Sequence, residues 1–255
     1  MISEDKQNGG LTVFEGMTSV RAVISAHESG RRIIESILVD ESRIKSRAKE
    51  LGWLKYKSGE LGFEIRFTDS EEIASLVTGS THGGIIALCR DRVIEPLTGA
   101  NIIENGFYAM IEGIEDPYNF GYAIRSLYAC GADGVILSPR NWMSAAGCVC
   151  RSSAGTSELI PMYSASGTDA AVMFREAGYR VICAGIRDSV SSFDCDLTRP
   201  LFLVVGGEKR GISSSLLSLA DCVVRIDYER TFSGSLSAAS ACDMLAYEIM
   251  RQNRK

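Results

Sequence analysis

Residues 201–213 read L-F-L-V-V-G-G-E-K-R-G-I-S, and this stretch indicates the fold class. The apolar run from Leu201 to Val205 predicts a strand buried on both faces, which is typical of a parallel sheet. Gly206 and Gly207 follow at the carboxyl end of the strand, where α/β proteins bind ligands and where glycine lets a ligand approach the backbone. A plain turn before a helix would explain the same glycines.

Around this stretch the expected strands and helices alternate, which favours an α/β protein with parallel sheets. Pro96 and Gly99 mark a linker. We therefore divide the chain into residues 1–97, a linker at 98–105 and residues 106–255. The pattern predicts strands at 33–40, 63–67, 85–89, 107–111, 135–137, 179–184, 201–205 and 223–226. It predicts helices at 43–58, after Asp69, at 119–130, at 168–177 and at 235–250.

The composition excludes several classes of protein. With 255 residues, 45% of them hydrophobic and 23% charged, the chain is neither collagen-like nor disordered. No apolar run exceeds five residues, so we expect no membrane span. The first residues, M-I-S-E-D-K, are polar where a secretory signal is apolar, so we expect a cytoplasmic protein.

The cysteines indicate buried, reduced thiols and no metal site. A zinc site needs clustered Cys or His ligands, but there is no C-x-x-C pair and the chain has only two His residues. The eight cysteines are scattered at 89, 130, 148, 150, 183, 195, 222 and 242.

The charge balance argues against nucleic acid overall but has one local exception. The formal net charge is −5, whereas phosphate is bound mainly by Lys and Arg. Between Arg31 and Lys57, however, eight basic and four acidic residues give a net charge of +4. A solvated helix face would explain this segment as well as an RNA-binding surface. The candidate RNA-binding residues are Arg31, Arg32, Arg43, Lys45 and Arg47.

A second informative stretch is G-I-E-D-P-Y-N-F-G-Y-A-I-R at 113–125. Asp116 and Pro117 predict a rigid turn, and Asn119 is a candidate cap of the following helix. Arg125 is expected on an apolar helix face, where a charge needs an anionic partner.

Two common nucleotide motifs fail in 201–213, and a third polar stretch follows it. The spacing of Gly206 and Gly211 is that of a phosphate loop, but Ile212 occupies the place of the lysine. No G-x-G-x-x-G is present either. The third stretch is R-I-D-Y-E-R-T-F-S-G-S-L-S-A-A-S-A at 225–241, in which Ser235 and Ser237 are candidate helix caps.

In this order and spacing the three stretches resemble the SpoU/TrmH class of SPOUT methyltransferases. The segment R-S-S-A-G-T-S-E-L-I-P at 151–161 also resembles that class. Motif one, D-P-x-N-x-G-x-x-x-R, is matched at Asp116, Pro117, Asn119, Gly121 and Arg125. Motif two, G-x-E-x-x-G, is matched at Gly206, Glu208 and Gly211. Motif three, I-P-M-x-G…S-L-N-V-S-x-A, is matched at Ile226, Ser235, Leu236 and Ala239. Ser237 stands where motif three has Asn, and Asp227 where it has Pro.

The resemblance implies a C-terminal SPOUT α/β domain with a trefoil knot. A smaller α/β ribosomal-protein-like substrate-binding domain would precede it, because T-H-G-G-I-I-A-L at 81–88 resembles the end of such a domain. The implied reaction transfers a methyl group from S-adenosyl-L-methionine to a ribose 2′-hydroxyl of RNA, with rRNA favoured over tRNA. The implied assembly is a homodimer in which motif one of one subunit approaches the cofactor of the other.

The resemblance also assigns roles to residues of this chain. The implied catalytic residues are Arg125, Glu208, Asn119 and Ser237. The implied cofactor-binding residues are Gly206, Ile226, Tyr228 and Leu236. An arginine with a pKa above about 12 is a poor base, so we expect Arg125 to orient phosphate and stabilise a developing alkoxide. The departures at Ser237 and Asp227 leave a non-catalytic RNA-binding or assembly protein as the alternative.

Overall fold

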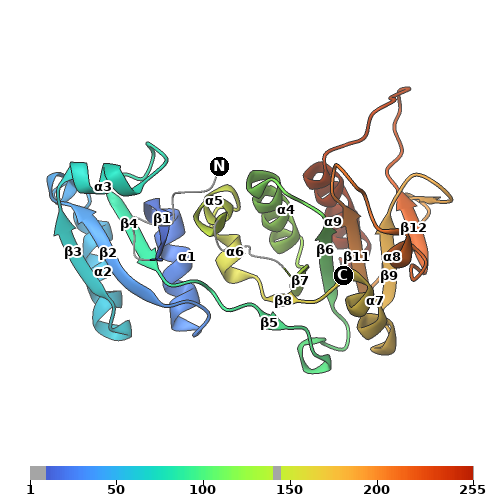
Figure 1. The fold of residues 1–255 in the computed structure, drawn as a ribbon, viewed down its shortest axis with the longest axis horizontal. Helices are drawn as coiled ribbons and strands as arrows, with labels where there is room; N and C mark the ends of the chain where they lie inside the picture. The colour runs from blue at the N-terminus through green and yellow to red at the C-terminus, as the bar shows by residue number, and fades with distance from the viewer. Residues whose placement is uncertain (1–9, 140–144, 255) are drawn as a thin grey trace. The chain divides into compact units, whose positions relative to one another are not determined.

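The computed structural model describes residues 10–139 and 145–254, which form two compact units (Figure 1). The first unit consists of residues up to Val93 together with residues 141–159. The second unit consists of residues 94–140 and the chain from Ile160 onward. The chain passes from the first unit to the second between Val93 and Ile94, and residues 145–159, which the sequence-based division places in the second domain, belong to the first unit.

The first unit is built on a four-stranded mixed sheet with the order β1-β4-β2-β3. Its strands are β1 (Thr12–Glu15), β2 (Ile34–Asp40), β3 (Glu64–Thr68) and β4 (Ile85–Cys89). Only β2 and β3 are parallel, because β4 runs antiparallel to both β1 and β2. Its helices are α1 (Gly16–Glu28), the 3₁₀ turn η1 (Glu41–Arg43), α2 (Ala48–Leu61), α3 (Ser70–Leu76), α5 (Ala146–Ser152) and α6 (Thr156–Leu159).

The second unit contains an eight-stranded sheet in which every pair of neighbours is parallel, as the alternating pattern predicts. The order is β10-β12-β9-β11-β6-β7-β8-β5. The strands are β5 (Glu95–Pro96), β6 (Phe107–Glu112), β7 (Gly134–Leu137), β8 (Met162–Ser164), β9 (Arg180–Ala184), β10 (Val190–Ser191), β11 (Leu201–Gly206) and β12 (Cys222–Arg225). The helices are α4 (Pro117–Ala129), α7 (Gly167–Glu176), α8 (Ser214–Leu217) and α9 (Ala238–Asn253), with the 3₁₀ turn η2 at Gly99–Asn101.

The central strand β11 shows why this sheet is apolar throughout. Phe202 and Val204 belong to a core cluster with α7 and α8, in which Phe174 stacks on Phe202 with ring centroids 4.4 Å apart. Leu203 and Val205 are buried on the opposite side of the strand, since successive side chains alternate between faces. On that side α9 packs against both β11 and α4. A strand covered on both faces must be apolar at every position.

Two predicted helices differ from the structure in extent, and one strand lies beside the predicted linker. The helix expected at 43–58 begins only at Ala48, because η1 and a turn occupy the preceding residues. Strand β5 lies just before the linker predicted at 98–105 and pairs with β8 at the edge of the larger sheet. The last helix begins at Ala238 rather than at 235. The remaining predicted strands and helices lie within one or two residues of their observed bounds.

Candidate active site

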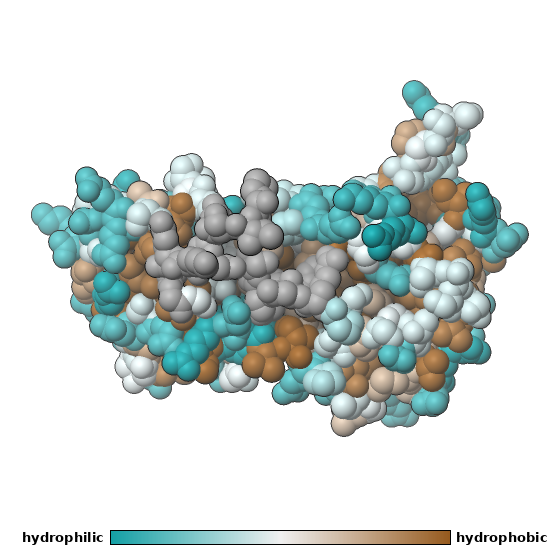
Figure 2. Space-filling model, viewed as in Figure 1, coloured by the Kyte–Doolittle hydropathy of each residue, from teal (hydrophilic) through white to brown (hydrophobic). Residues whose placement is uncertain are grey.

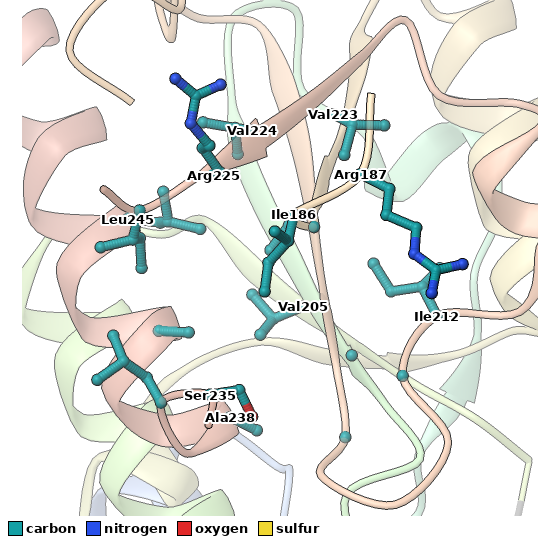
Figure 3. A pocket seen from close by; sticks show the side chains of 18 of the residues that line it. Ile186, Arg187, Val205, Ile212, Val223, Val224, Arg225, Ser235, Ala238 and Leu245 are labelled. Carbon is teal, nitrogen blue, oxygen red and sulfur yellow. The ribbon is translucent and has the colours of Figure 1, made fainter. Parts of the chain in front are cut away.

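A cavity of about 440 Å³ lies in the second unit beside the carboxyl ends of β9, β11 and β12 (Figure 3). This volume is in the range of small-molecule sites, which are mostly apolar with a few polar groups. Five residues selected from the sequence line it: Gly206, Glu208, Ile226, Tyr228 and Leu236. The sequence pattern and the geometry therefore converge on the same sheet edge.

Gly206 forms part of the cavity wall at a place where a side chain has no room. A Cβ atom on this residue would lie 2.7–2.8 Å from backbone atoms of Gly211 and Ile212. The loop that follows is closed by an isolated bridge between Gly207 and Gly211, and the Gly207 N–H donates to the Glu112 carbonyl at 2.5 Å. Residues 206–211 thus form a tight backbone rim around the cavity, where a ligand would meet backbone groups directly.

Two arginines line the cavity and differ in how they are held. The Arg225 guanidinium donates to Asp227 Oδ1 at 2.8 Å and to the Ser189 carbonyl at 2.6 Å. Hydrogen bonds, from Ser191 first and then from Arg225, hold the pKa of Asp227 below its usual value. Arg187 is exposed and has no ion pair within the described residues, and Figure 3 shows its side chain extending beside Ile212, away from Arg225.

Motifs one and two meet through a direct hydrogen bond. The Asn119 Nδ2 atom donates to Glu208 Oε1 at 2.9 Å, joining residues that are 89 positions apart in the chain. Asn119 can make this bond because the cap of α4 is Asp116, whose Oδ1 accepts from the Tyr118 N–H at 2.9 Å. The prediction that Asn119 caps the helix is therefore wrong. Its side chain lies in the first turn and supports Glu208 instead.

Arg125 lies on the exposed face of α4, whereas Ile124 and Leu127 are buried. The expectation that it sits on an apolar face is wrong, because adjacent helical positions differ by about 100° in direction. Tyr122 and Tyr128, three positions before and after it, are 49% and 43% exposed and share its face. Arg125 does not line the cavity of its own chain.

Ser237 has a structural role in α9. It is the N-cap, and its Oγ accepts from the Ser240 N–H at 3.1 Å. Ser237 does not line the cavity, although its neighbours Leu236 and Ala238 do. The helix-capping interpretation explains this serine fully.

The candidate RNA-binding residues of the first unit separate into two groups. Arg43 and Lys45 are exposed and Arg47 is partly exposed, with an ion pair to Glu50 at 3.0 Å. Arg31 donates to the Leu159 carbonyl at 2.8 Å. Arg32 is only 3% exposed. The structure therefore leaves Arg32 unable to contact RNA, since its guanidinium is occupied inside the unit.

Arg32 instead makes a buried ion pair with Glu158 of α6. Its Nε donates to Glu158 Oε2 at 2.6 Å and its Nη2 to Glu158 Oε1 at 3.0 Å. Burial alone lowers the pKa of the Arg32 guanidinium, but the adjacent carboxylate outweighs burial and leaves it raised. This pair attaches α6 to the rest of the first unit.

Sequence reasoning missed the cavity residues that follow β9. Gly185, Ile186 and Arg187 line the cavity, and β9 ends at the same sheet edge as β11. Because the strand at 179–184 was predicted, the rule that ligands bind at carboxyl ends of strands could have identified them.

The described residues contain neither a membrane-spanning helix nor a cluster of metal ligands. None of the helices in 10–139 and 145–254 is both long enough and apolar enough to cross a membrane. Within those ranges, no group of three or more His, Cys, Asp or Glu side chains could hold a metal ion.

Comparison with known families gives two matches that together cover most of the chain. The profile of the SpoU rRNA Methylase family matches residues 106–247. A profile described as RNA 2′-O ribose methyltransferase substrate binding matches residues 20–92. The two matched segments correspond to the larger parts of the second and first units.

Individual relatives align along nearly their whole length. YacO of Bacillus subtilis, named for the TrmH family of tRNA/rRNA methyltransferases, is 26% identical over 91% of this chain and 93% of its own. The 23S rRNA (guanosine-2′-O-)-methyltransferase RlmB of Shewanella oneidensis is 23% identical over 94% of this chain and 96% of its own. The crystal structure of the SpoU methyltransferase AviRb from Streptomyces viridochromogenes with AdoMet superposes with a TM-score of 0.77. It is 22% identical and covers 99% of this chain and 94% of AviRb.

Proposed function

The chain belongs to the SpoU rRNA methylase family, and we propose that it transfers a methyl group from S-adenosylmethionine to a ribose 2′-hydroxyl of ribosomal RNA. The observation that carries this proposal is the cavity at the carboxyl edge of β9, β11 and β12. Residues from motifs two and three line it, and Asn119 of motif one is hydrogen-bonded to Glu208 on its rim.

The cavity fits S-adenosylmethionine in size and chemistry. Its walls are mostly aliphatic, and the rim at Gly206 presents backbone where a side chain would clash. Gly206, Ile226, Tyr228 and Leu236 would hold the cofactor. When bound, it supplies a methyl group already activated on a sulfonium, so the protein must supply alignment and manage the hydroxyl proton.

Different residues around the cavity would align the RNA and stabilise the charge that develops on the ribose oxygen. Glu208 and Asn119 hold each other, which fixes the rim beside the start of α4. Arg125 offers a guanidinium, which suits it to orient an RNA phosphate and to stabilise the alkoxide that develops on the ribose. Because Arg125 does not line the cavity of its own chain, we infer a homodimer in which it faces the cavity of the partner protomer.

The first unit supplies the RNA-binding surface in this proposal. The match of residues 20–92 to a substrate-binding profile supports this role. Three basic side chains of this unit are exposed or partly exposed: Arg43, Lys45 and Arg47. Their positive charges would bind the phosphates of the RNA backbone. An rRNA target also implies a cytoplasmic location.

The test is methyl transfer from tritiated S-adenosylmethionine to ribosomal RNA, followed by digestion to nucleosides. We expect label in 2′-O-methylated nucleosides and much less with tRNA as substrate. Label in base-methylated nucleosides would overturn the 2′-hydroxyl assignment, and stronger labelling of tRNA would overturn the rRNA assignment. RNA binding without any methyl transfer would favour the assembly-protein alternative.

A further inference from the structure

The loop between β12 and α9 projects from the second unit next to the proposed cofactor cavity. It is the long excursion between these two elements in Figure 1, and in Figure 2 it stands clear of the neighbouring surface with hydrophilic side chains at its tip. Its sequence is Y-E-R-T-F-S-G-S at 228–235, within the third motif segment. The cavity uses Tyr228 and Ser235 at the two ends of this loop but none of the residues between them.

Within the loop, Phe232 contacts other residues of the loop although 56% of its surface is exposed. Its ring packs edge to face on Tyr228, with centroids 5.6 Å apart and planes at 62°. Gly234 lies against the ring, because a Cβ atom there would be 2.7 Å from Phe232 Cζ. Tyr228 is itself anchored, since its hydroxyl accepts from the Leu236 N–H at 3.3 Å. One part of the Phe232 ring thus packs on Tyr228, a residue of the cavity wall, and the rest of the ring faces solvent.

Tyr228 and Gly234 cover part of the Phe232 ring, but 56% of its surface stays exposed to solvent. Covering that remaining apolar surface, for example with the face of a ligand, would be favourable. Glu229 and Arg230, the charged residues of the loop, are exposed and of opposite charge, so the loop has no net charge. The feature that the loop presents to a ligand is therefore the aromatic ring of Phe232.

We propose that Phe232 is a stacking platform for an unpaired base of the RNA substrate, adjacent to the nucleotide whose ribose enters the site. This inference rests on the proposed function and adds the form of RNA that the site accepts. Unpaired bases stack on aromatic side chains whatever their identity, because every base has a π-face. A base in a duplex is already stacked, so the platform selects a loop, a bulge or an end.

Direct binding measures this role without knowledge of the natural substrate. The full-length protein, with S-adenosylhomocysteine present, is titrated with a single-stranded RNA of about ten nucleotides that contains 2-aminopurine. The same oligonucleotide annealed to its complement is the paired probe. We expect tighter binding of the single strand, and quenching of the 2-aminopurine fluorescence by stacking.

Three variants separate stacking from other causes. Phe232→Ala is expected to weaken single-strand binding about tenfold and to abolish the quenching, whereas Phe232→Trp retains both. Gly234→Ala keeps the ring but displaces it from its seat, so we expect a smaller loss. Phe193→Ala is the matched control, because Phe193 is 78% exposed in the same unit but lies outside the loop at 228–235.

Salt dependence and cofactor binding give readouts that a merely structural role would not reproduce. Stacking releases no counterions, so the slope of log affinity against log salt should not change in Phe232→Ala. Affinity for S-adenosylmethionine, measured by calorimetry, should stay within about twofold. Unchanged RNA binding in Phe232→Ala would overturn the proposal. An equal loss of cofactor and RNA affinity would also overturn it, because Phe232 would then be a lid over the cofactor. Wild-type protein that binds RNA but no S-adenosylmethionine would contradict the proposed function instead.

Discussion

Arg125 is the residue at which the proposed chemistry can be tested most directly. It is exposed on α4 and lies outside the cavity of its own chain, so its removal should leave the cofactor site intact. We expect Arg125→Ala to reduce the single-turnover rate of methyl transfer by about 10²-fold, because the developing alkoxide loses a fixed positive charge. Calorimetry should show unchanged affinity for S-adenosylmethionine.

Arg125→Lys distinguishes simple charge from the geometry of the guanidinium. Lysine keeps the charge but cannot form the paired hydrogen bonds of arginine, so recovery should be partial. Arg175→Ala on α7, also partly exposed and outside the cavity, serves as the surface control. If Arg125→Ala transferred methyl groups at the wild-type rate, the role assigned to this residue would be wrong.

At the scale of single residues, the sequence predicted which side chains lie near the cavity better than it predicted their contacts. Local spacing predicts Asn119 as a helix cap, but Asp116 is the cap, and the Asn119 side-chain amide donates to Glu208 instead. The partner lies 89 residues away in the loop after β11, and such a contact depends on how the strands are ordered. Arg32 was nominated for RNA because it is basic, and its burial with Glu158 depends on a segment 126 residues distant.

At the scale of elements, the ion pair of Arg32 and Glu158 joins α6 to the rest of the first unit. We expect that removing only one of its two partners lowers the free energy of unfolding more than breaking an exposed pair does. Both side chains are almost completely buried, at 1% and 3% exposure. Glu158→Ala leaves the guanidinium buried without a partner, so we expect the free energy of unfolding to fall by about 3–5 kcal/mol. Equilibrium urea unfolding followed by circular dichroism measures this change.

The matched control for that experiment is Glu50→Ala, which removes the carboxylate from the exposed pair with Arg47. We expect a much smaller loss there, because solvent screens the charges. Replacing both buried partners, as in Arg32→Met with Glu158→Leu, should recover much of the stability. Equal effects of Glu158→Ala and Glu50→Ala would show that α6 does not depend on the buried pair.

Asp40 makes the first unit sensitive to acid. It accepts hydrogen bonds from the Ser42 N–H at 2.9 Å and the Ser70 hydroxyl at 2.7 Å, linking η1 to the start of α3. Burial raises the pKa of this carboxyl, but the hydrogen bonds from Ser42 and Ser70 outweigh burial and lower it overall. A pKa lower in the folded state means that Asp40 stabilises the unit above its unfolded pKa of about 3.9 and that this contribution disappears as pH falls through the folded pKa.

Asp40→Asn should therefore lower the melting temperature at pH 7 and lower it less as the pH approaches 3. Thermal unfolding between pH 7 and pH 3 gives the comparison, and Asp69→Asn, a capping carboxylate in the same unit with an exposed side chain, is a control. A constant difference between wild type and Asp40→Asn across this range would contradict the assignment.

The sequence predicted well those strands and helices whose secondary structure is determined by their own residues. Apolar runs located the strands of the parallel sheet, and Asp69 marked the start of α3, where its side chain accepts from the Glu72 N–H. Strand β5 could not be predicted in this way. Its two residues, Glu95 and Pro96, are both exposed, and they form a strand only because β8 lies beside them.

For the whole molecule, thiol reactivity tests how the cysteines are packed. Five of the eight, at positions 89, 150, 183, 195 and 242, are buried, and burial raises the pKa of Cys183 to about 12. A thiol held in its protonated form is unreactive. We expect dithionitrobenzoate to react in native protein with Cys130, Cys148 and Cys222 at most, and with all eight cysteines in guanidinium. Rapid native reaction at Cys183 would show that the core around β9 is open.

The threading of the chain and the assembly of two copies are the features that neither periodicity nor spacing could establish, and the trefoil knot stays a prediction. The shared site can be tested with two variants that fail for different reasons. Arg125→Ala keeps the cavity but lacks the guanidinium. Gly206→Val keeps the guanidinium, but its side chain would meet the backbone of Gly211 and Ile212 and so should prevent cofactor binding.

Mixing the two inactive variants distinguishes a shared site from a site within one chain. After unfolding and refolding together, half of the dimers are mixed, and each mixed dimer contains one site with both an intact cavity and an intact Arg125 if the site is shared. We then expect methyl transfer at about a quarter of the wild-type rate. If each chain carried its complete site, every chain in the mixture would be defective. In that case activity would stay at the level of the single variants, and the homodimer that places Arg125 opposite its partner's cavity would be ruled out.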